Sequence, residues 1–152
     1  MQFNTSFGPV WAEIDGNGAV RQFGFGENPS AGGFNEEVAI QVREYFDGVR
    51  HSFVLPLAMR GTAFQLRVWA ELQEIPYGTT ITYRELGERA GKENSARAAA
   101  RANATNPIAL IVPCHRVVSA SGDVTGYLYG IELKKKLLEF ETRIRSASRD
   151  AF

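Results

Sequence analysis

Hydrophobic positions in the first third of the chain alternate as they do in strands. Apolar and aromatic residues recur over residues 3–14, a run of Asp, Asn and Gly occupies 15–18, and a second apolar run covers 20–25. Two such runs on either side of a tight-turn signal predict a β-hairpin. Over residues 38–46 the apolar spacing becomes helical. A short strand is expected over 53–55.

The apolar spacing stays mostly helical after Thr62, which we expect to cap a helix. Thr80 or Thr82 caps a second short helix, which Gly91 breaks, and a third opens near Asn94-Ser95 and runs over residues 96–102. Two short helices joined by a tight, glycine-containing turn predict a helix-turn-helix.

The last third combines a buried run with an aromatic loop. The apolar run 108–112 precedes Pro113, which predicts a buried strand that ends at Cys114. Residues 124–130 form a glycine-bounded aromatic segment, which is either a lid over a planar ligand or a loop whose tyrosines pack on the core. A helix is expected over 132–141, with three consecutive lysines on its solvated face or against phosphate.

These elements predict an α+β fold in two parts. We expect an N-terminal subdomain of antiparallel sheet plus helix over 1–58, and a mostly helical C-terminal subdomain with the helix-turn-helix over 59–152. Hydrophobic residues make up 44% and charged residues 22% of the 152, which is ordinary for a globular protein and excludes a disordered chain. No signal peptide or membrane span is apparent.

Charge and cysteine content narrow the function. The formal net charge is zero, which argues against a strongly basic nucleic-acid coat but leaves room for a local basic patch. One cysteine forms no internal disulfide, which fits a reducing cytoplasm. One cysteine and two histidines also fall short of a typical zinc site, so neither a metal nor another cofactor is expected.

The candidate chemistry lies in the sequence Val-Pro-Cys-His-Arg-Val at 112–117. It places the only cysteine, Cys114, directly before His115. A lone cysteine is usually a small buried hydrophobe. A neighbouring imidazole, however, can withdraw the thiol proton directly or through a water, and the thiolate is the nucleophile. Cys114 is therefore a candidate nucleophile with His115 as its base.

The helix at 96–102 is almost entirely alanine except for Arg97 and Arg101, which are four residues apart and share one side. One interpretation is a well-formed amphipathic helix. The other depends on size, because the minor groove of B-DNA is only about 6 Å wide and admits a helix only where the side chains are small. Ala96 and Ala98 beside Arg97 meet that condition.

Residues 61–141 resemble the O6-alkylguanine-DNA alkyltransferases, also called methylated-DNA–protein-cysteine methyltransferases. The resemblance rests on Ile75-Pro76-Tyr77-Gly78, Thr82-Tyr83, Ala96-Arg97-Ala98, Asn106-Pro107, Ile111 to Val118 around the Pro-Cys-His-Arg-Val motif, and Leu137 to Glu141. It implies a ribonuclease H-like first subdomain. It also implies repair of O6-alkylguanine, and of O4-alkylthymine, in double-stranded DNA by a single transfer after the nucleotide has been flipped from the minor groove.

The resemblance also implies roles for individual residues. Cys114 accepts the alkyl group, His115 deprotonates it through a bound water, Glu141 orients His115, and Tyr83 hydrogen-bonds the flipped guanine. Arg97 fills the gap in the duplex, and neighbouring helix residues contact DNA. Asn106 ties the recognition helix to the reactive segment, and backbone groups of the active-site region read the base edge. The neighbouring DNA contacts are Ala96, Ala98 and Arg101, and the backbone groups are those of Cys114, Val117 and Leu128.

Two positions depart from the common pattern of the family: Ala99-Ala100 replaces Val-Gly, and Leu128-Tyr129 replaces small residues. Neither change removes a reacting group. The bulkier lid predicts that methyl is transferred much better than benzyl. At Leu128 the hydroxyl common in the family is absent, so a donor to O6 from that position has to be the backbone N–H.

Two other functions remain open. A cysteine hydrolase could use Cys114, His115 and Glu141 as a triad, but it would leave the alanine-arginine helix unexplained. A non-catalytic sensor of alkylated DNA would not need the cysteine. We expect a monomer in solution with no membrane contact, and the sequence leaves open whether binding along DNA is cooperative.

Overall fold

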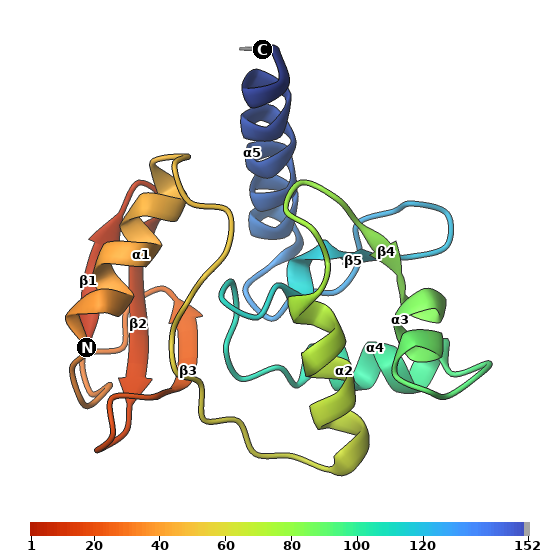
Figure 1. The fold of residues 1–152 in the computed structure, drawn as a ribbon, viewed down its shortest axis with the longest axis horizontal. Helices are drawn as coiled ribbons and strands as arrows, with labels where there is room; N and C mark the ends of the chain where they lie inside the picture. Colours follow the sequence, from red (N-terminus) through yellow and green to blue (C-terminus); the bar gives the residue numbers. More distant parts are fainter. Residues whose placement is uncertain (151–152) are drawn as a thin grey trace. The chain divides into compact units, whose positions relative to one another are not determined.

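The structure is a computed structural model that describes residues 1–150, with side chains described as far as Ala147 (Figure 1). The chain contacts divide it into two compact units. One comprises Met1–Met59 and Pro107–Ile111, and the other comprises Arg60–Asn106 and the chain from Val112 onward. The division that we expected after residue 58 does not include the return of Pro107–Ile111 to the first unit.

The first unit is built on a three-stranded antiparallel sheet in the order β1 (Gln2–Thr5), β2 (Gly8–Ile14), β3 (Val20–Phe25). The predicted hairpin between β2 and β3 is confirmed. The single strand expected over 3–14 is wrong, because a turn divides it. Thr5 Oγ1 accepts from Phe7 N at 3.1 Å and donates to the Gly8 carbonyl at 2.8 Å, which reverses the chain between β1 and β2.

Helix α1 (Glu36–Phe46) covers one face of this sheet (Figure 1). Asn35 caps it by accepting from Glu37 N at 3.0 Å, and the predicted helix is confirmed. Its apolar stripe and alternate residues of β2 are buried, and each such side chain stabilises the fold by about 1.5–3 kcal/mol. The buried residues are Val38, Val42, Tyr45 and Phe46 from α1, and Val10, Ala12 and Ile14 from β2.

The strand expected over 53–55 is wrong. The Gln41 side chain takes both backbone groups of Val54, accepting from its N–H at 2.9 Å and donating to its carbonyl at 3.1 Å. These groups are therefore not available to a neighbouring strand. Pairing begins only at Leu57, where Val20 N donates to the Pro56 carbonyl at 2.8 Å.

The second unit is mainly helical, and the predicted helix starts at Thr62 and Thr82 are confirmed. Thr62 forms a capping box with Gln65, and Thr82 Oγ1 accepts from Glu85 N at 3.2 Å. No helix in the described residues is both long and apolar enough to cross a membrane. The elements are α2 (Ala63–Gln73), β4 (Ile81–Thr82), α3 (Tyr83–Arg89), α4 (Ala96–Ala104), β5 (Val117–Val118), which pairs in parallel with β4, and α5 (Ile131–Asp150).

Helices α3 and α4 pack against each other as the predicted helix-turn-helix (Figure 1). The connecting turn takes positive φ at Gly91 (88°) and Asn94 (53°), a conformation that these residue types tolerate best. Trp69 of α2 holds α4 in place, because its Nε1 donates to the Ala102 carbonyl at 2.9 Å. The buried side of α4 therefore faces α2, while Arg97 remains exposed.

The strand expected over 108–112 is also wrong, although the segment is buried as expected. Ile108 forms a single bridge to Phe23 and the chain then turns, with Leu110 at φ 68° and Ile111 N donating to the Ala109 carbonyl at 2.8 Å. An apolar run marks burial but does not separate a strand from a buried turn. Cys114 consequently begins a 3₁₀ turn, Cys114–Arg116, that leads into β5.

Candidate active site

Two asparagines, Asn103 on α4 and Asn106 two residues after its end, hold the backbone on either side of Pro113. Asn106 Nδ2 donates to the Val112 carbonyl at 2.8 Å, and Asn103 Nδ2 donates to the Cys114 carbonyl at 3.3 Å. Pro113 has no N–H to donate. The two side-chain amides hold the carbonyls before and after it, and so fix Cys114, which is 7% exposed, relative to the helix-turn-helix.

A buried carboxylate lies at the centre of the site. Glu141 of α5 accepts from His115 Nε2 at 2.8 Å and from Arg116 Nε and Nη2 at 2.8 and 3.0 Å. Gly78 N donates a fourth bond at 3.2 Å. His115 and Glu141 are fully buried, and Arg116 is 5% exposed. The remaining arm of Arg116 donates to the Ile75 carbonyl at 2.9 Å, so the charged groups are almost completely hydrogen-bonded.

These contacts set the charge of Glu141 and His115. Burial alone would raise the pKa of Glu141, but its bonds to His115 and Arg116 outweigh burial and hold that pKa well below its usual range. Burial lowers the pKa of His115, and the charges of Arg116 and Lys134 add to this while Glu141 opposes it. Since Arg116 already neutralises Glu141, the imidazole is neutral at neutral pH and is able to accept a proton.

The thiol needs such a base. Burial raises the pKa of Cys114, opposed by the hydrogen bond from Asn106 and the charge of Lys134. Cys114 is therefore a protonated thiol at neutral pH, and a nucleophile only after the proton has been removed. A protonated thiol beside a neutral imidazole is the resting pair that this geometry supports.

The lid segment is held by a fully buried lysine. Lys134 of α5 donates from Nζ to the carbonyls of Thr125 and Gly126 at 2.5 and 3.2 Å, and to the Tyr83 hydroxyl at 3.4 Å. The Tyr83 hydroxyl in turn donates to the Thr125 carbonyl at 3.2 Å. Lys134 thus joins the start of the lid to Tyr83 at the N-terminus of α3, and the expectation that it is solvated or meets phosphate is wrong.

Two tyrosines of the lid lie near the thiol. The rings of Tyr127 and Tyr129 pack edge to face with centroids 6.0 Å apart. Burial raises the pKa of both hydroxyls, and the charge of the Cys114 thiolate raises them further. Leu128, between them, points outward and is 76% exposed. Tyr127 and Tyr129 are half-buried, which agrees with a loop that packs its tyrosines on the protein, while a lid over a planar ligand stays a prediction.

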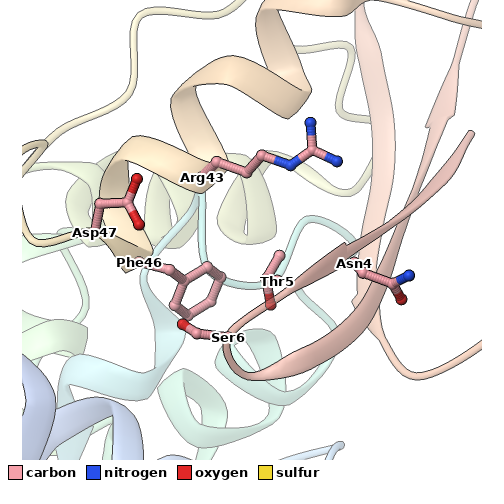
Figure 2. A pocket seen from close by; sticks show the side chains of 6 residues that line it. All are labelled: Asn4, Thr5, Ser6, Arg43, Phe46 and Asp47. Atoms are coloured by element: carbon pink, nitrogen blue, oxygen red, sulfur yellow. The ribbon is translucent and has the colours of Figure 1, made fainter.

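Two hollows outside this site are lined by different kinds of residue. One of about 590 Å³ lies over the helix-turn-helix and is lined by Arg84, Asn94, Ala96 and Arg97. In the first unit, a hollow of about 270 Å³ lies where the β1–β2 turn meets the end of α1 (Figure 2). Its six lining residues include no cysteine, histidine or lysine. Within the described part of the chain, no three His, Cys, Asp or Glu side chains gather to hold a metal ion.

Comparison with known proteins identifies the family. Residues 63–143 match the family described as 6-O-methylguanine DNA methyltransferase, DNA binding domain. The methylated-DNA–protein-cysteine methyltransferase of Methanosarcina barkeri is 49% identical over 108 residues, which cover 71% of this chain and 68% of the relative. The Mycolicibacterium paratuberculosis methyltransferase is 47% identical over 129 residues, covering 85% and 76%. The chain belongs to the 6-O-methylguanine DNA methyltransferase family.

Solved structures agree with this methyltransferase assignment. The Mycobacterium tuberculosis OGT in complex with DNA superposes with a TM-score of 0.86 and 38% identity, covering 94% of this chain and 92% of that one. The O6-methylguanine methyltransferase of the same species gives 0.80 and 36%, covering 93% and 91%. The predicted α+β fold, a sheet with one helix followed by a helical DNA-binding part, is therefore that of the methyltransferases.

The methyltransferase site contains most of the residues named from the sequence, in two groups. Cys114, His115 and Glu141 lie together, with Asn106 and the buried Val117 beside them and Tyr83 joined to the lid. On α4, Ala96, Arg97 and Arg101 are exposed and Ala98 is half-buried. Leu128 lies on the exposed side of the lid.

Three residues of the methyltransferase site are not predicted from the sequence: Arg116, Lys134 and Asn103. Arg116 stands in the motif itself, yet its bidentate bond to Glu141 depends on α5, which is distant in sequence. Lys134 was grouped with its two lysine neighbours. A signal existed, because Lys134, Leu137 and Glu141 follow i, i+3, i+7 spacing and share the buried face of α5. Asn103 carries no sequence signal beyond its place on the inner side of α4.

Removing the Glu141 charge should destabilise the fold. In Glu141→Gln, Arg116 keeps a buried charge without a counter-charge, and we expect the free energy of unfolding to fall by about 3–5 kcal/mol in urea denaturation. Glu139→Gln, two residues away and exposed, is the matched control and should change it by less than about 0.5 kcal/mol. Equal losses in both variants would contradict the central position of Glu141.

Proposed function

We propose that this chain repairs DNA by moving the alkyl group of O6-alkylguanine in duplex DNA onto Cys114, once per protein molecule. The observation that carries the proposal is the bond from His115 Nε2 to Glu141, 2.8 Å long and fully buried. It engages one imidazole nitrogen and leaves Nδ1, which has no hydrogen bond to protein, to act as the base. A neutral base beside a protonated thiol is what such a transfer requires.

The transfer balances without a cofactor. The thiol proton passes through a water to His115 Nδ1, and Sγ attacks the alkyl carbon of the lesion. The bond from that carbon to O6 breaks as the carbon–sulfur bond forms, and the electron pair remains on the guanine ring. The ring takes up a proton from solvent to become ordinary guanine, and the imidazolium returns its proton to solvent, so no net proton is gained or lost. Glu141 stabilises the imidazolium while it exists.

We assign Tyr83 to the leaving base. Its hydroxyl lies at the start of α3, between the helix-turn-helix and the lid, and is hydrogen-bonded to both Lys134 and the Thr125 carbonyl. A donor there would neutralise charge that develops on the ring as the alkyl carbon departs. The backbones at Cys114, Val117 and Leu128 would read the base edge.

Helix α4 is the proposed minor-groove element. Ala96 is exposed beside Arg97, and Arg101 follows one turn later on the same side. Small side chains permit close approach to the groove, and Arg97 would enter the duplex in place of the flipped nucleotide. We propose that one monomer suffices for the transfer, in the cytoplasm, where the thiol stays reduced.

The product is a thioether, which offers water no good leaving group, so Cys114 is not regenerated. The protein should be incubated with a duplex oligonucleotide carrying O6-methylguanine, and the peptide that contains Cys114 weighed by mass spectrometry. We expect one methyl group per chain and an equal loss of methyl from the DNA. Cys114→Ala should abolish transfer but retain DNA binding, and Arg97→Ala should weaken flipping while the thiol remains intact.

The other two functions give different results in the same experiment. Release of more than one methyl per chain would indicate a cysteine hydrolase. Binding without modification would indicate a sensor. Transfer by Cys114→Ala would show that the nucleophile is a different residue.

The lid should limit the size of the alkyl group. The charge of Cys114 raises the pKa of both Tyr127 and Tyr129, so the two rings lie near the thiol and restrict the space beside it. We therefore expect single-turnover transfer of methyl to be much faster than that of benzyl. The same duplex carrying either adduct provides the comparison. Tyr129→Ala should narrow the difference by opening space beside the thiol. Equal rates for both adducts in the unaltered protein would contradict a size limit.

A further inference from the structure

Three polar atoms in the region of the thiol are buried and make no hydrogen bond to protein: Asn103 Oδ1, His115 Nδ1 and Tyr127 OH. Leaving a polar atom buried without a partner costs about 1–3 kcal/mol. A water molecule that reaches these atoms would remove the three costs.

Each atom belongs to a residue tied to Cys114. Asn103 Nδ2 donates to the Cys114 carbonyl at 3.3 Å, and only the amide nitrogen can donate to a carbonyl, so Oδ1 is the end that has no partner. His115 is the next residue, with Nε2 occupied by Glu141. Tyr127 is coupled to Cys114 through the charge of the thiolate, which raises the pKa of the phenol beyond the effect of burial.

Their donors and acceptors are complementary to one water molecule. A water donates twice and accepts twice, and a buried water typically makes about three hydrogen bonds. Neutral His115 Nδ1 and Asn103 Oδ1 are acceptors, whereas the Cys114 thiol and the Tyr127 hydroxyl are donors. Two donors and two acceptors match the full capacity of a single water.

We propose that Asn103 and Tyr127 are positioning residues that hold the water through which His115 takes the proton of Cys114. The inference rests on the proposed function and assigns it two further residues. The Sγ–H bond breaks as the water oxygen takes that proton, and the water passes one of its own protons to Nδ1. The water is unchanged, and one proton has moved from sulfur to nitrogen.

This arrangement makes the helix-turn-helix part of the proton path. Asn103 lies on α4, six residues or about one and two-thirds turns after Arg97, so the same helix would enter the DNA and hold the relay water. Asn106 is a poorer candidate, because its side chain already hydrogen-bonds both the Val112 carbonyl at 2.8 Å and the Cys114 thiol itself. The titratable and charged groups around the thiol are His115, Arg116, Tyr127, Tyr129, Lys134 and Glu141.

The test is the pH profile of single-turnover methyl transfer in Tyr127→Phe and Asn103→Leu. At pH 7.5 each should slow transfer by about ten- to a hundredfold, since a positioned base contributes about 10²–10⁴. The loss should shrink as the pH rises toward the raised pKa of the Cys114 thiol, because a growing fraction of the thiol then ionises without the relay. Tyr127→Phe removes a hydroxyl that bonds no protein group, so it tests the water with little effect on folding.

Further variants separate a relay from a structural role. In the double variant the rate should fall no further than in the slower single variant, because both changes remove the same water. Tyr45→Phe, in the first unit, is the matched control and should transfer at the normal rate. A loss that is equal at every pH, or two single losses that multiply, would overturn the inference. A failure of the unaltered protein to methylate Cys114 would instead overturn the proposed function.

Discussion

The buried bond between Glu141 and Arg116 is the interaction on which the rest of the site depends. It places a carboxylate in the interior without leaving it uncompensated, and it comes from residues 25 positions apart. Because Arg116 already balances the charge, Glu141 can orient His115 without forcing it to be protonated. Desolvation of an ion pair is costly, so its benefit here lies in the state it gives the imidazole more than in stability.

Helix α4 connects the proposed DNA-binding surface to the reactive cysteine. Asn103 and Asn106 project from the inner side and end of α4 and hold the carbonyls of Cys114 and Val112. The exposed side of that helix carries Arg97. A helix of nine residues therefore presents arginine outward and fixes the nucleophile inward. Lys134 performs a similar task for the lid by joining Thr125 to Tyr83.

Local signals in the sequence were sufficient where the structure is local. Thr62 and Thr82 cap the helices they were expected to cap, and the Asp-Asn-Gly turn connects β2 to β3. The β1–β2 turn, which Thr5 closes locally, is an exception, because the expected strand over 3–14 ran through it. The other errors concern backbone that is not paired in a sheet. Gln41 takes the groups of Val54, and the segment before Cys114 turns instead of pairing, although its burial pattern is that of a strand. The Cys114–His115 pair and Glu141 could be named from the motif, whereas the bond of Arg116 to Glu141 and the burial of Lys134 required α5 to be in place.

Activation of Cys114 by proton transfer depends on a resting pair of protonated thiol and neutral imidazole. Nitrogen-15 NMR of labelled protein measures it directly, with His51→Gln removing the other histidine signal. We predict that at pH 7, with DNA absent, His115 is a neutral imidazole with its proton on Nε2, and that it remains neutral down to below pH 6.5. An imidazolium at pH 7 would mean that Cys114 is already a thiolate paired with it, and it would contradict activation by proton transfer.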